Sequence, residues 1–299
     1  MPRPPTARRA EGHEGWDEYA PFYDWENART LGRRDVPFWR TVALNAGGPL
    51  LELGCGTGRI SIPLARAGVP LVGIDRSAPM LARARQRVKR ARLGARVHLV
   101  RGDIRFLPFA DARPRRRGRV TSSAAKAGEG LPRRSAKRES GFGMVLAPYG
   151  MLQSLLRERD LKATLAAVHR VLQPGGTFGV ELVADLPSWQ EYRQRVSLKG
   201  WRSKGGAHVT LTETVRQDRK RGLTIFDQEF SERRGSRTST RQFSLTFRTL
   251  SVPQMVRRLE TAGFEITALL GDYKGRAWDS RADVWVILAR KRSTSKRST

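Results

Sequence analysis

Residues 51–59 read LELGCGTGR, and this stretch decides the fold of the chain. Its apolar start is typical of a buried strand, because it is short and bounded by glycine. The glycines Gly54, Gly56 and Gly58 allow a tight turn and let a bound molecule approach the backbone without meeting a Cβ. Apolar residues at helical spacing follow over 60–67, so the stretch predicts a strand, a glycine-rich loop and a helix N-terminus.

The same alternation of strand and helix patterns continues beyond this loop. Further buried strands are predicted near 70–75, 97–100, 143–147 and 177–183, and helices over 80–91 and 161–172. Strands that alternate with helices in this way indicate βαβ units and a parallel sheet. In the last third, residues alternate between apolar and polar over 209–217, 223–232 and 242–250, which predicts an antiparallel meander. A helix over 252–262 and strands near 265–270 and 284–289 complete the chain.

Composition divides the chain into one domain with three atypical segments. Residues 1–15 are predicted to be a disordered leader, because they are rich in Pro, Arg and Gly and lack periodicity. Residues 16–290 form the domain, in which 112–140 is expected to be a disordered basic insertion and 205–250 an antiparallel substrate or lid subdomain. Residues 291–299 form a basic tail.

The net charge of +29 raises the question of an anionic partner. Nucleic acid is one interpretation, since basic surfaces bind it by releasing counterions. The other is an arginine-rich proteome with solvated basic segments. The insertion contains no aromatic residue, whereas RNA-binding surfaces use stacking aromatics beside basic residues. Specific nucleic-acid binding is therefore not expected.

Several classes are excluded by what the sequence lacks. No apolar run approaches the length that a membrane span needs, and no secretory signal is recognisable, so a soluble cytoplasmic protein is expected. The single cysteine, Cys55, excludes an intramolecular disulfide and a cysteine-based zinc cluster. The four histidines lack ligand spacing, so no metal site is expected. The oligomeric state is not predicted.

Acidic residues follow the predicted strands at positions that suit a nucleoside ligand. Asp75 ends the second strand, where a carboxylate can accept hydrogen bonds from both hydroxyls of a ribose. Asp103 ends the third strand, and Glu52 lies inside the first. Structural roles are the alternatives: a helix cap for Asp75, a chain turn for Asp103, and a partner for a buried backbone group for Glu52.

Taken in order, these motifs resemble the class I S-adenosylmethionine-dependent methyltransferases. The motifs are LELGCGTGR, GIDRS at 73–77, VRGDIRFLPF at 100–109, and GFGMVLAPYGMLQSLL at 141–156 followed by VHRVLQPGG. The resemblance covers about residues 19–183. It implies an α/β fold with a doubly wound, mostly parallel seven-stranded Rossmann-like sheet, here with an antiparallel β insertion, and S-adenosyl-L-methionine as the methyl donor.

The resemblance also implies roles for individual residues. Gly54, Gly56 and Gly58 would border the methionine and ribose, Glu52 the amino group, Asp75 the ribose hydroxyls, Arg76 and Ile104 the adenine ring, and Asp103 its exocyclic amine. Tyr149 would lie at the rim of the methyl-transfer pocket, and Tyr23 belongs to an N-terminal segment of the kind that covers the cofactor; both are candidate catalytic residues. One departure is Phe142-Gly143, where the family commonly has Phe-Asp.

Missing motifs limit the methyl acceptor. The stretch after the fourth strand, Ala147-Pro148-Tyr149-Gly150, does not match the Pro-Pro motif of adenine-N6 methyltransferases, and it lacks the cysteine that cytosine-C5 enzymes use. We therefore expect a methyltransferase acting on an N or O atom of a small molecule. The alternatives are a tRNA or rRNA methyltransferase and a non-catalytic protein that binds S-adenosylmethionine.

Overall fold

The computed structural model describes residues 11–30, 32, 34–112, 141–183, 190–203 and 206–292. Parts of four predicted segments lie outside the described residues: 1–10 of the leader, 113–140 of the insertion, position 205 of the antiparallel subdomain and 293–299 of the tail.

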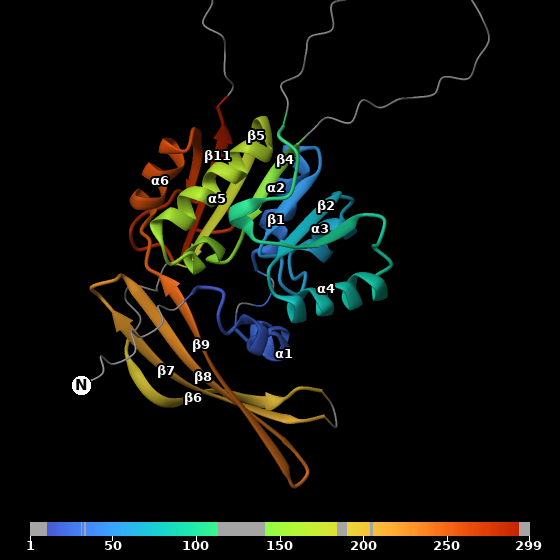
Figure 1. The fold of residues 1–299 in the computed structure, drawn as a ribbon, viewed down its shortest axis with the longest axis vertical. Coiled ribbons are helices and arrows are strands. Elements are labelled where there is room, and N and C mark those ends of the chain that lie inside the picture. Colours follow the sequence, from blue (N-terminus) through green and yellow to red (C-terminus); the bar gives the residue numbers. More distant parts are fainter. Residues whose placement is uncertain are drawn as a thin grey trace, which may run out of the picture.

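Seven strands form one sheet in the order β3-β2-β1-β4-β5-β11-β10 (Figure 1). Their bounds are β1 (Leu50–Leu53), β2 (Leu71–Asp75), β3 (Val97–Arg101), β4 (Phe142–Ala147), β5 (Leu172–Val183), β10 (Phe264–Leu270) and β11 (Val284–Lys291). Strands β1 to β5 pair in parallel, whereas β11 runs antiparallel to both β5 and β10. This confirms the predicted doubly wound, mostly parallel sheet.

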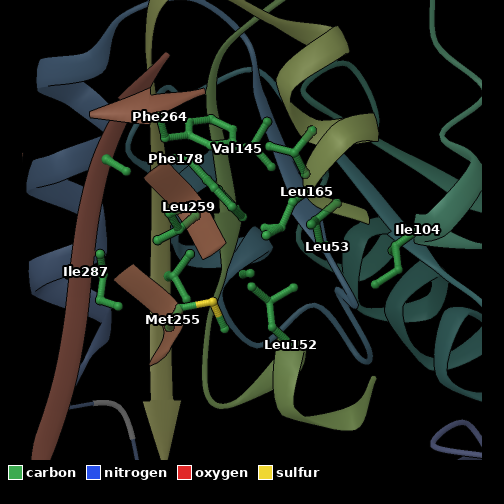
Figure 2. Packing of buried hydrophobic residues seen from close by; sticks show 14 of the residues in the cluster. Leu53, Ile104, Val145, Leu152, Leu165, Phe178, Met255, Leu259, Phe264 and Ile287 are labelled. Carbon is green, nitrogen blue, oxygen red and sulfur yellow. The ribbon is translucent and has the colours of Figure 1, made fainter. Parts of the chain in front are cut away.

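Helices cover both faces of this sheet. One face carries α2 (Val36–Ala46), α3 (Ser61–Arg66) and α4 (Ala78–Arg90), and the other carries α5 (Glu158–Val171) and α6 (Val252–Thr261). Figure 2 shows the second layer, where Leu165 and Leu259 pack around Phe178. Each large apolar side chain buried in this way stabilises the fold by about 1.5–3 kcal/mol. None of the described helices is long and apolar enough to span a bilayer.

Hydrogen bonds at the helix starts explain why two of these helices begin where they do. The Ser77 hydroxyl accepts a hydrogen bond from the Met80 backbone N–H at 3.2 Å, ahead of α4. Ser251 and Gln254 form a reciprocal capping box at the start of α6. Both caps satisfy backbone N–H groups that lack a partner inside the helix.

Gly143, the departure from the family pattern, has a steric cause. A Cβ at this position would lie 2.0 Å from the carbonyl oxygen of Gly47, so no larger residue fits unless the backbone shifts. The Gly143 N–H donates to the Pro49 carbonyl at 3.0 Å, which fixes the start of β4 beside β1. The chain therefore forms this strand with glycine where the family commonly has aspartate.

A second, antiparallel sheet has four strands in the order β6-β7-β8-β9. These are β6 (Tyr192–Trp201), β7 (His208–Asp218), β8 (Leu223–Arg234) and β9 (Arg237–Arg248). The sequence predicted three strands and missed β6, because this edge strand is mostly exposed and lacks regular apolar alternation. Strand β5 also starts earlier than predicted, at Leu172, because Leu172 pairs with Phe142 of β4 ahead of the Pro-Gly-Gly.

Helix α1 (Trp16–Asn27) lies between the antiparallel sheet and α4 (Figure 1). The Phe22 ring stacks on Phe230 of β8 with centroids 4.1 Å apart. On its other side, the Asp24 carboxylate accepts hydrogen bonds from the Thr57 hydroxyl and from Arg87, both at 2.7 Å. These contacts attach α1 to the glycine-rich loop and to α4 at once.

Residues 11–15 differ from the expected disordered leader, because they form turns packed on the body. Glu11 forms an ion pair with Arg157 just before α5. The Trp16 indole N–H donates to the Gly12 carbonyl at 3.1 Å, which holds the turn against the start of α1. The aromatic helix α1 therefore holds residues 11–15 in place, although these residues themselves lack apolar periodicity.

Candidate functional site

A cavity of about 260 Å³ opens at the carboxyl ends of β1, β2 and β3, next to α1. The strand order reverses between β1 and β4, and the carboxyl side of such a reversal is the usual ligand site of an open parallel sheet. Most of the predicted site residues line this cavity: Tyr23, Glu52, Gly54, Gly56, Asp75, Arg76, Asp103, Ile104 and Tyr149. Among the predicted residues, only Gly58 is outside the wall.

Two glycines of the glycine-rich loop, Gly54 and Gly58, have different structural roles. Gly54 has φ +63°, and a Cβ there would lie 2.6 Å from the side chain of Met151 at the cavity wall. Gly58 has φ +78°, and a Cβ there would lie 3.3 Å from Ile62 of α3 and 3.8 Å from Ala84 of α4. Gly54 therefore keeps the cavity open, whereas Gly58 allows α3 and α4 to pack against the loop.

Asp75 is held in the cavity wall by backbone hydrogen bonds. The Gly56 N–H donates to Oδ2 and the Ser77 N–H to Oδ1, each at 2.8 Å. Burial raises the pKa of Asp75, although these hydrogen bonds oppose the shift. A carboxylate oxygen accepts more than one hydrogen bond, so Asp75 is fixed in direction and can still accept from a bound molecule.

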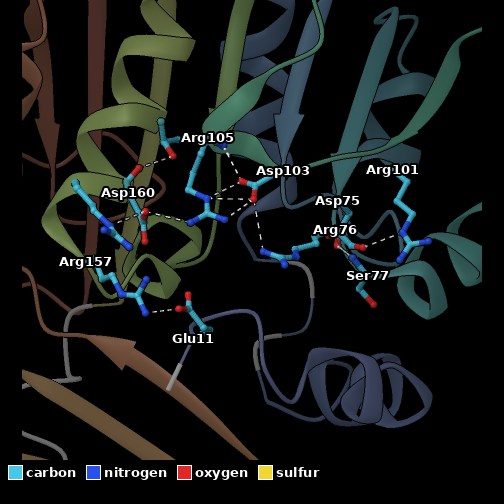
Figure 3. Close-up of polar contacts among 11 residues, drawn as sticks. Glu11, Asp75, Arg76, Ser77, Arg101, Asp103, Arg105, Arg157 and Asp160 are labelled. Atoms are coloured by element: carbon cyan, nitrogen blue, oxygen red, sulfur yellow. Dashed lines mark hydrogen bonds and ion pairs between the residues drawn. The ribbon is translucent and has the colours of Figure 1, made fainter. Parts of the chain in front are cut away.

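Asp103 belongs to an ionic network at the other end of the cavity (Figure 3). Arg105 donates to both of its oxygens, with Nη2 to Oδ2 at 2.6 Å, and Arg76 Nη1 lies 3.5 Å from Oδ2. Arg105 also bonds Asp160 at 3.1 Å. Burial alone would raise the pKa of Asp103, but the hydrogen bonds from Arg105 hold it below its usual value. Buried Ile104 adds apolar surface beside this charged group.

Glu52 lies on the cavity wall and is almost fully buried. The Ser61 hydroxyl donates a hydrogen bond to its carboxylate. Burial raises the pKa of Glu52 to about 8, and the bonds from Ser61 and the charge of Arg59 only partly oppose that shift. The unliganded protein therefore holds Glu52 mainly in its protonated form at neutral pH.

Arg59, which directly follows the glycine-rich loop, lies beside Tyr23 and Tyr149, and we call this part of the cavity its tyrosine end. Its guanidinium donates two hydrogen bonds of 2.8 Å to the buried carboxylate of Asp35. The guanidinium carbon also lies 5.6 Å from the centroid of the Tyr149 ring. Burial raises the pKa of Tyr23, and a hydrogen bond and charge from Arg59 oppose this shift. The two candidate tyrosines thus lie around one buried cation.

Tyr149 has a left-handed backbone conformation, with φ +47°. Such a conformation is uncommon for a bulky residue and persists only where neighbours impose it. Here Glu181 of β5 supplies that restraint: its backbone carbonyl accepts from the Gly150 N–H at 3.1 Å. Its carboxylate is fixed in turn by the Tyr273 hydroxyl at 2.7 Å and by the Trp39 indole N–H at 3.2 Å. Buried contacts therefore direct Tyr149 into the cavity.

Sequence reasoning missed several wall residues. Arg59 was inside the quoted motif, and its position after Gly58 was a signal that could have been used. His13 comes from the N-terminal turn, Trp16 is the first residue of α1, and Phe247 comes from the end of β9. No local pattern marks these three as cavity residues, because only the docking of α1 and of the antiparallel sheet brings them there.

Comparison with known proteins agrees with this geometry. A family described as a methyltransferase domain matches residues 50–115, which contain the glycine-rich loop, Asp75 and Asp103. Over 247 residues the chain is 26% identical to a cypemycin N-terminal methyltransferase from Streptomyces sp, covering 82% of this chain and 84% of that protein. The chain is a class I S-adenosylmethionine-dependent methyltransferase. Its motifs, sheet order and cavity agree with this assignment.

Solved structures with the same fold as this methyltransferase include CcbJ and CalS10. The CcbJ methyltransferase from Streptomyces caelestis has a TM-score of 0.68 at 22% identity, covering 93% of this chain and 97% of that one. CalS10 from Micromonospora echinaspora is described as an amino pentose methyltransferase and was solved with S-adenosylmethionine bound. Its TM-score is 0.60 at 18% identity, and the match covers 91% of this chain and 96% of that one.

S-adenosylmethionine is the methyl donor of this methyltransferase. The residues of the cavity fit that molecule. The loop at Gly54 leaves space where a Cβ would intrude. The fixed carboxylate of Asp75 suits two hydroxyl donors, and Ile104 offers an apolar surface for a flat ring.

Proposed function

We propose that this methyltransferase transfers a methyl group to the nitrogen of a small-molecule amine. Bound S-adenosylmethionine supplies an electrophilic methyl group, so the acceptor needs an available lone pair and alignment with the methyl carbon. The cypemycin N-terminal methyltransferase, by its name, acts at an N-terminus, and its similarity covers most of both chains. This relationship supports nitrogen over oxygen as the acceptor atom.

The observation that carries the proposal is the aromatic wall of the cavity next to the glycine-rich loop. Trp16, Tyr23, Tyr149 and Phe247 line the same cavity as Gly54. Aromatic faces stabilise, through cation–π contact, the positive charge that develops on the amine nitrogen during transfer, and they exclude water from the site. Burial raises the pKa of Tyr149, so its phenol stays protonated at neutral pH and orients the acceptor rather than acting as a base.

A neutral amine needs no catalytic base before transfer, whereas a hydroxyl acceptor has to lose a proton. Burial raises the pKa of both candidate tyrosines above the ordinary value, so neither supplies a phenolate base at neutral pH. We therefore infer that Tyr23 and Tyr149 align the amine and shield it from water. The proton of the methylated ammonium leaves to solvent after transfer.

We further propose that the wall residues hold the cofactor as their positions suggest. Asp75 would accept from the ribose hydroxyls, and Gly54 and Gly56 would lie along the methionine and ribose. Glu52 would face the amino group, whose positive charge favours the carboxylate over the protonated form. Asp103, already paired with Arg105, would share its remaining lone pairs with the adenine amine, while Arg76 and Ile104 would flank the ring.

The acceptor class is tested by incubating the full chain with S-adenosylmethionine and matched pairs of small molecules. Each pair presents the same scaffold with an amino group or with a hydroxyl group. Formation of S-adenosylhomocysteine and the mass of the product are measured, with a folded Tyr149→Ala variant as the control for the cavity. We expect methylation of amines only, rising with pH as the amine loses its proton. Methylation of the hydroxyl partner, or of RNA in preference to either, would overturn the proposal.

A further inference from the structure

The inner face of the antiparallel sheet changes from apolar to basic along its length. Phe230 on β8 packs on Phe22 of α1, and its cross-strand partner on β9 is Arg241. Cross-strand partners lie on the same face of a sheet, as do residues two apart along a strand. Arg234 on β8 and Arg237 on β9 are paired with each other and therefore extend the same face beyond α1.

Arg202, just after β6, joins this basic surface from the neighbouring hairpin. Its guanidinium carbon lies 5.1 Å from the centroid of the Phe22 ring, and Nη1 lies 2.7 Å from Oε1 of Glu232. Its Nε and Nη2 are buried and have no hydrogen-bond partner among the described residues. Buried donors are normally satisfied, and leaving one without an acceptor is unfavourable.

We name this surface the arginine end of the sheet and define it by Arg83 of α4 together with Arg202, Arg234, Arg237 and Arg241. Burial lowers the pKa of Arg202, and the charges of Arg83, Arg234 and Arg241 lower it further, against the opposing charge of Glu232. Arg202 therefore lies close enough to Arg83, Arg234 and Arg241 to be repelled by their charges. Within the described part of the chain, Glu232 is the carboxylate that the contacts assign to this group.

We propose that the arginine end of the sheet is a binding site for a phosphoryl group, separate from the methyl-transfer cavity. Guanidinium groups match the oxygens of phosphate with pairs of hydrogen bonds, and the exposed Arg234, Arg237 and Arg241 present three of them on one face of the sheet. Arg241 precedes Phe247, which lines the cavity, by six residues on β9. At about 3.4 Å per strand residue, the two sites lie roughly 20 Å apart.

The test uses the full chain and inorganic pyrophosphate, measured by calorimetry at about 0.15 M ionic strength. The double variant Arg234→Ser/Arg241→Ser removes two exposed side chains of the site. The matched control, Arg219→Ser/Lys220→Ser, removes the same charge from the exposed turn between β7 and β8. We expect the first variant to weaken pyrophosphate binding at least tenfold and the control to change it less than twofold. S-adenosylhomocysteine binding should stay unchanged in both.

A competition with single-stranded oligothymidylate distinguishes the two sources of the phosphoryl group. If the oligonucleotide displaces pyrophosphate at lower concentration, and if this displacement is lost in the arginine variant, the result supports the site with nucleic acid as its ligand. Binding of pyrophosphate without such displacement supports it with a small phosphorylated compound. Equal weakening in the control variant would show general charge attraction and overturn the proposal, as would the absence of pyrophosphate binding in the wild-type chain.

Discussion

The guanidinium of Arg59 and the carboxylate of Asp35 form a buried pair, with Nη1–Oδ1 and Nη2–Oδ2 both at 2.8 Å. The side chain of Asp35 has no exposed surface, and that of Arg59 is 10% exposed. The pair joins the end of the glycine-rich loop to the start of α2. The tyrosine end of the cavity therefore depends on a charge pair that is largely shielded from solvent.

Replacing Arg59 with Met should destabilise the protein by about 3–5 kcal/mol, because it leaves the Asp35 carboxylate buried without a counter-charge. The free energy of unfolding in urea measures this loss. The double variant Arg59→Met/Asp35→Leu removes both charges and should recover most of it. If the single variant unfolds within about 1 kcal/mol of the wild type, the pair does not have the assigned role.

Replacing Asp75 with Ala should weaken S-adenosylhomocysteine binding about ten- to a hundredfold, since a charge-assisted contact with the ribose contributes about 1.5–3 kcal/mol. Calorimetry on the folded variant measures the change. Asp75→Asn keeps one carbonyl oxygen for the Gly56 N–H, so it separates loop structure from loss of charge. Asp283→Ala changes an exposed carboxylate and serves as the control. Unchanged affinity in a folded Asp75→Ala protein contradicts the ribose assignment.

Removing the hydroxyl of Tyr149 should slow methyl transfer about tenfold, the effect of one hydrogen bond in the transition state. Tyr149→Phe retains the ring beside Arg59, so stability and S-adenosylhomocysteine affinity should change little. Steady-state kinetics with an amine that the matched-pair assay shows to be methylated measures kcat and KM separately. Tyr19→Phe is the matched control, because the Tyr19 hydroxyl bonds Glu26 and does not line the cavity. Equal kinetics for both variants would exclude an aligning role.

Replacing Glu52 with Gln should change the pH dependence of stability. The pKa of Glu52 is raised by burial from 4.5 to about 8, so the folded protein keeps the proton over a range where the unfolded chain has lost it. Its contribution is therefore fully present below about pH 4.5 and is lost as the pH rises to about 8. The unfolding free energy of wild type minus variant should fall by about 1.4 kcal/mol per pH unit over that range. A pH-independent difference would show that Glu52 is ionised in the folded protein.

Local patterns in the sequence determined the doubly wound sheet and one half of the site. Strands with continuous apolar runs, a glycine-rich loop and the acidic residues at strand ends are all encoded within a few neighbouring positions. Because the carboxyl ends of parallel strands meet at one edge, knowing the strands was enough to bring Glu52, Asp75 and Asp103 to one cavity.

Tertiary structure alone decided the other half. The left-handed turn at Tyr149 depends on Glu181, and the edge strand β6 depends on pairing with β7, so neither has a distinct local pattern. Phe247 reaches the cavity from the far end of the chain only because α1 and the antiparallel sheet dock there. Such contacts join residues widely separated in sequence, and packing between whole elements selects them. Apolar periodicity and loop chemistry identify the elements themselves but not how they dock, which is why Trp16 and Phe247 were found in the cavity only from the tertiary structure.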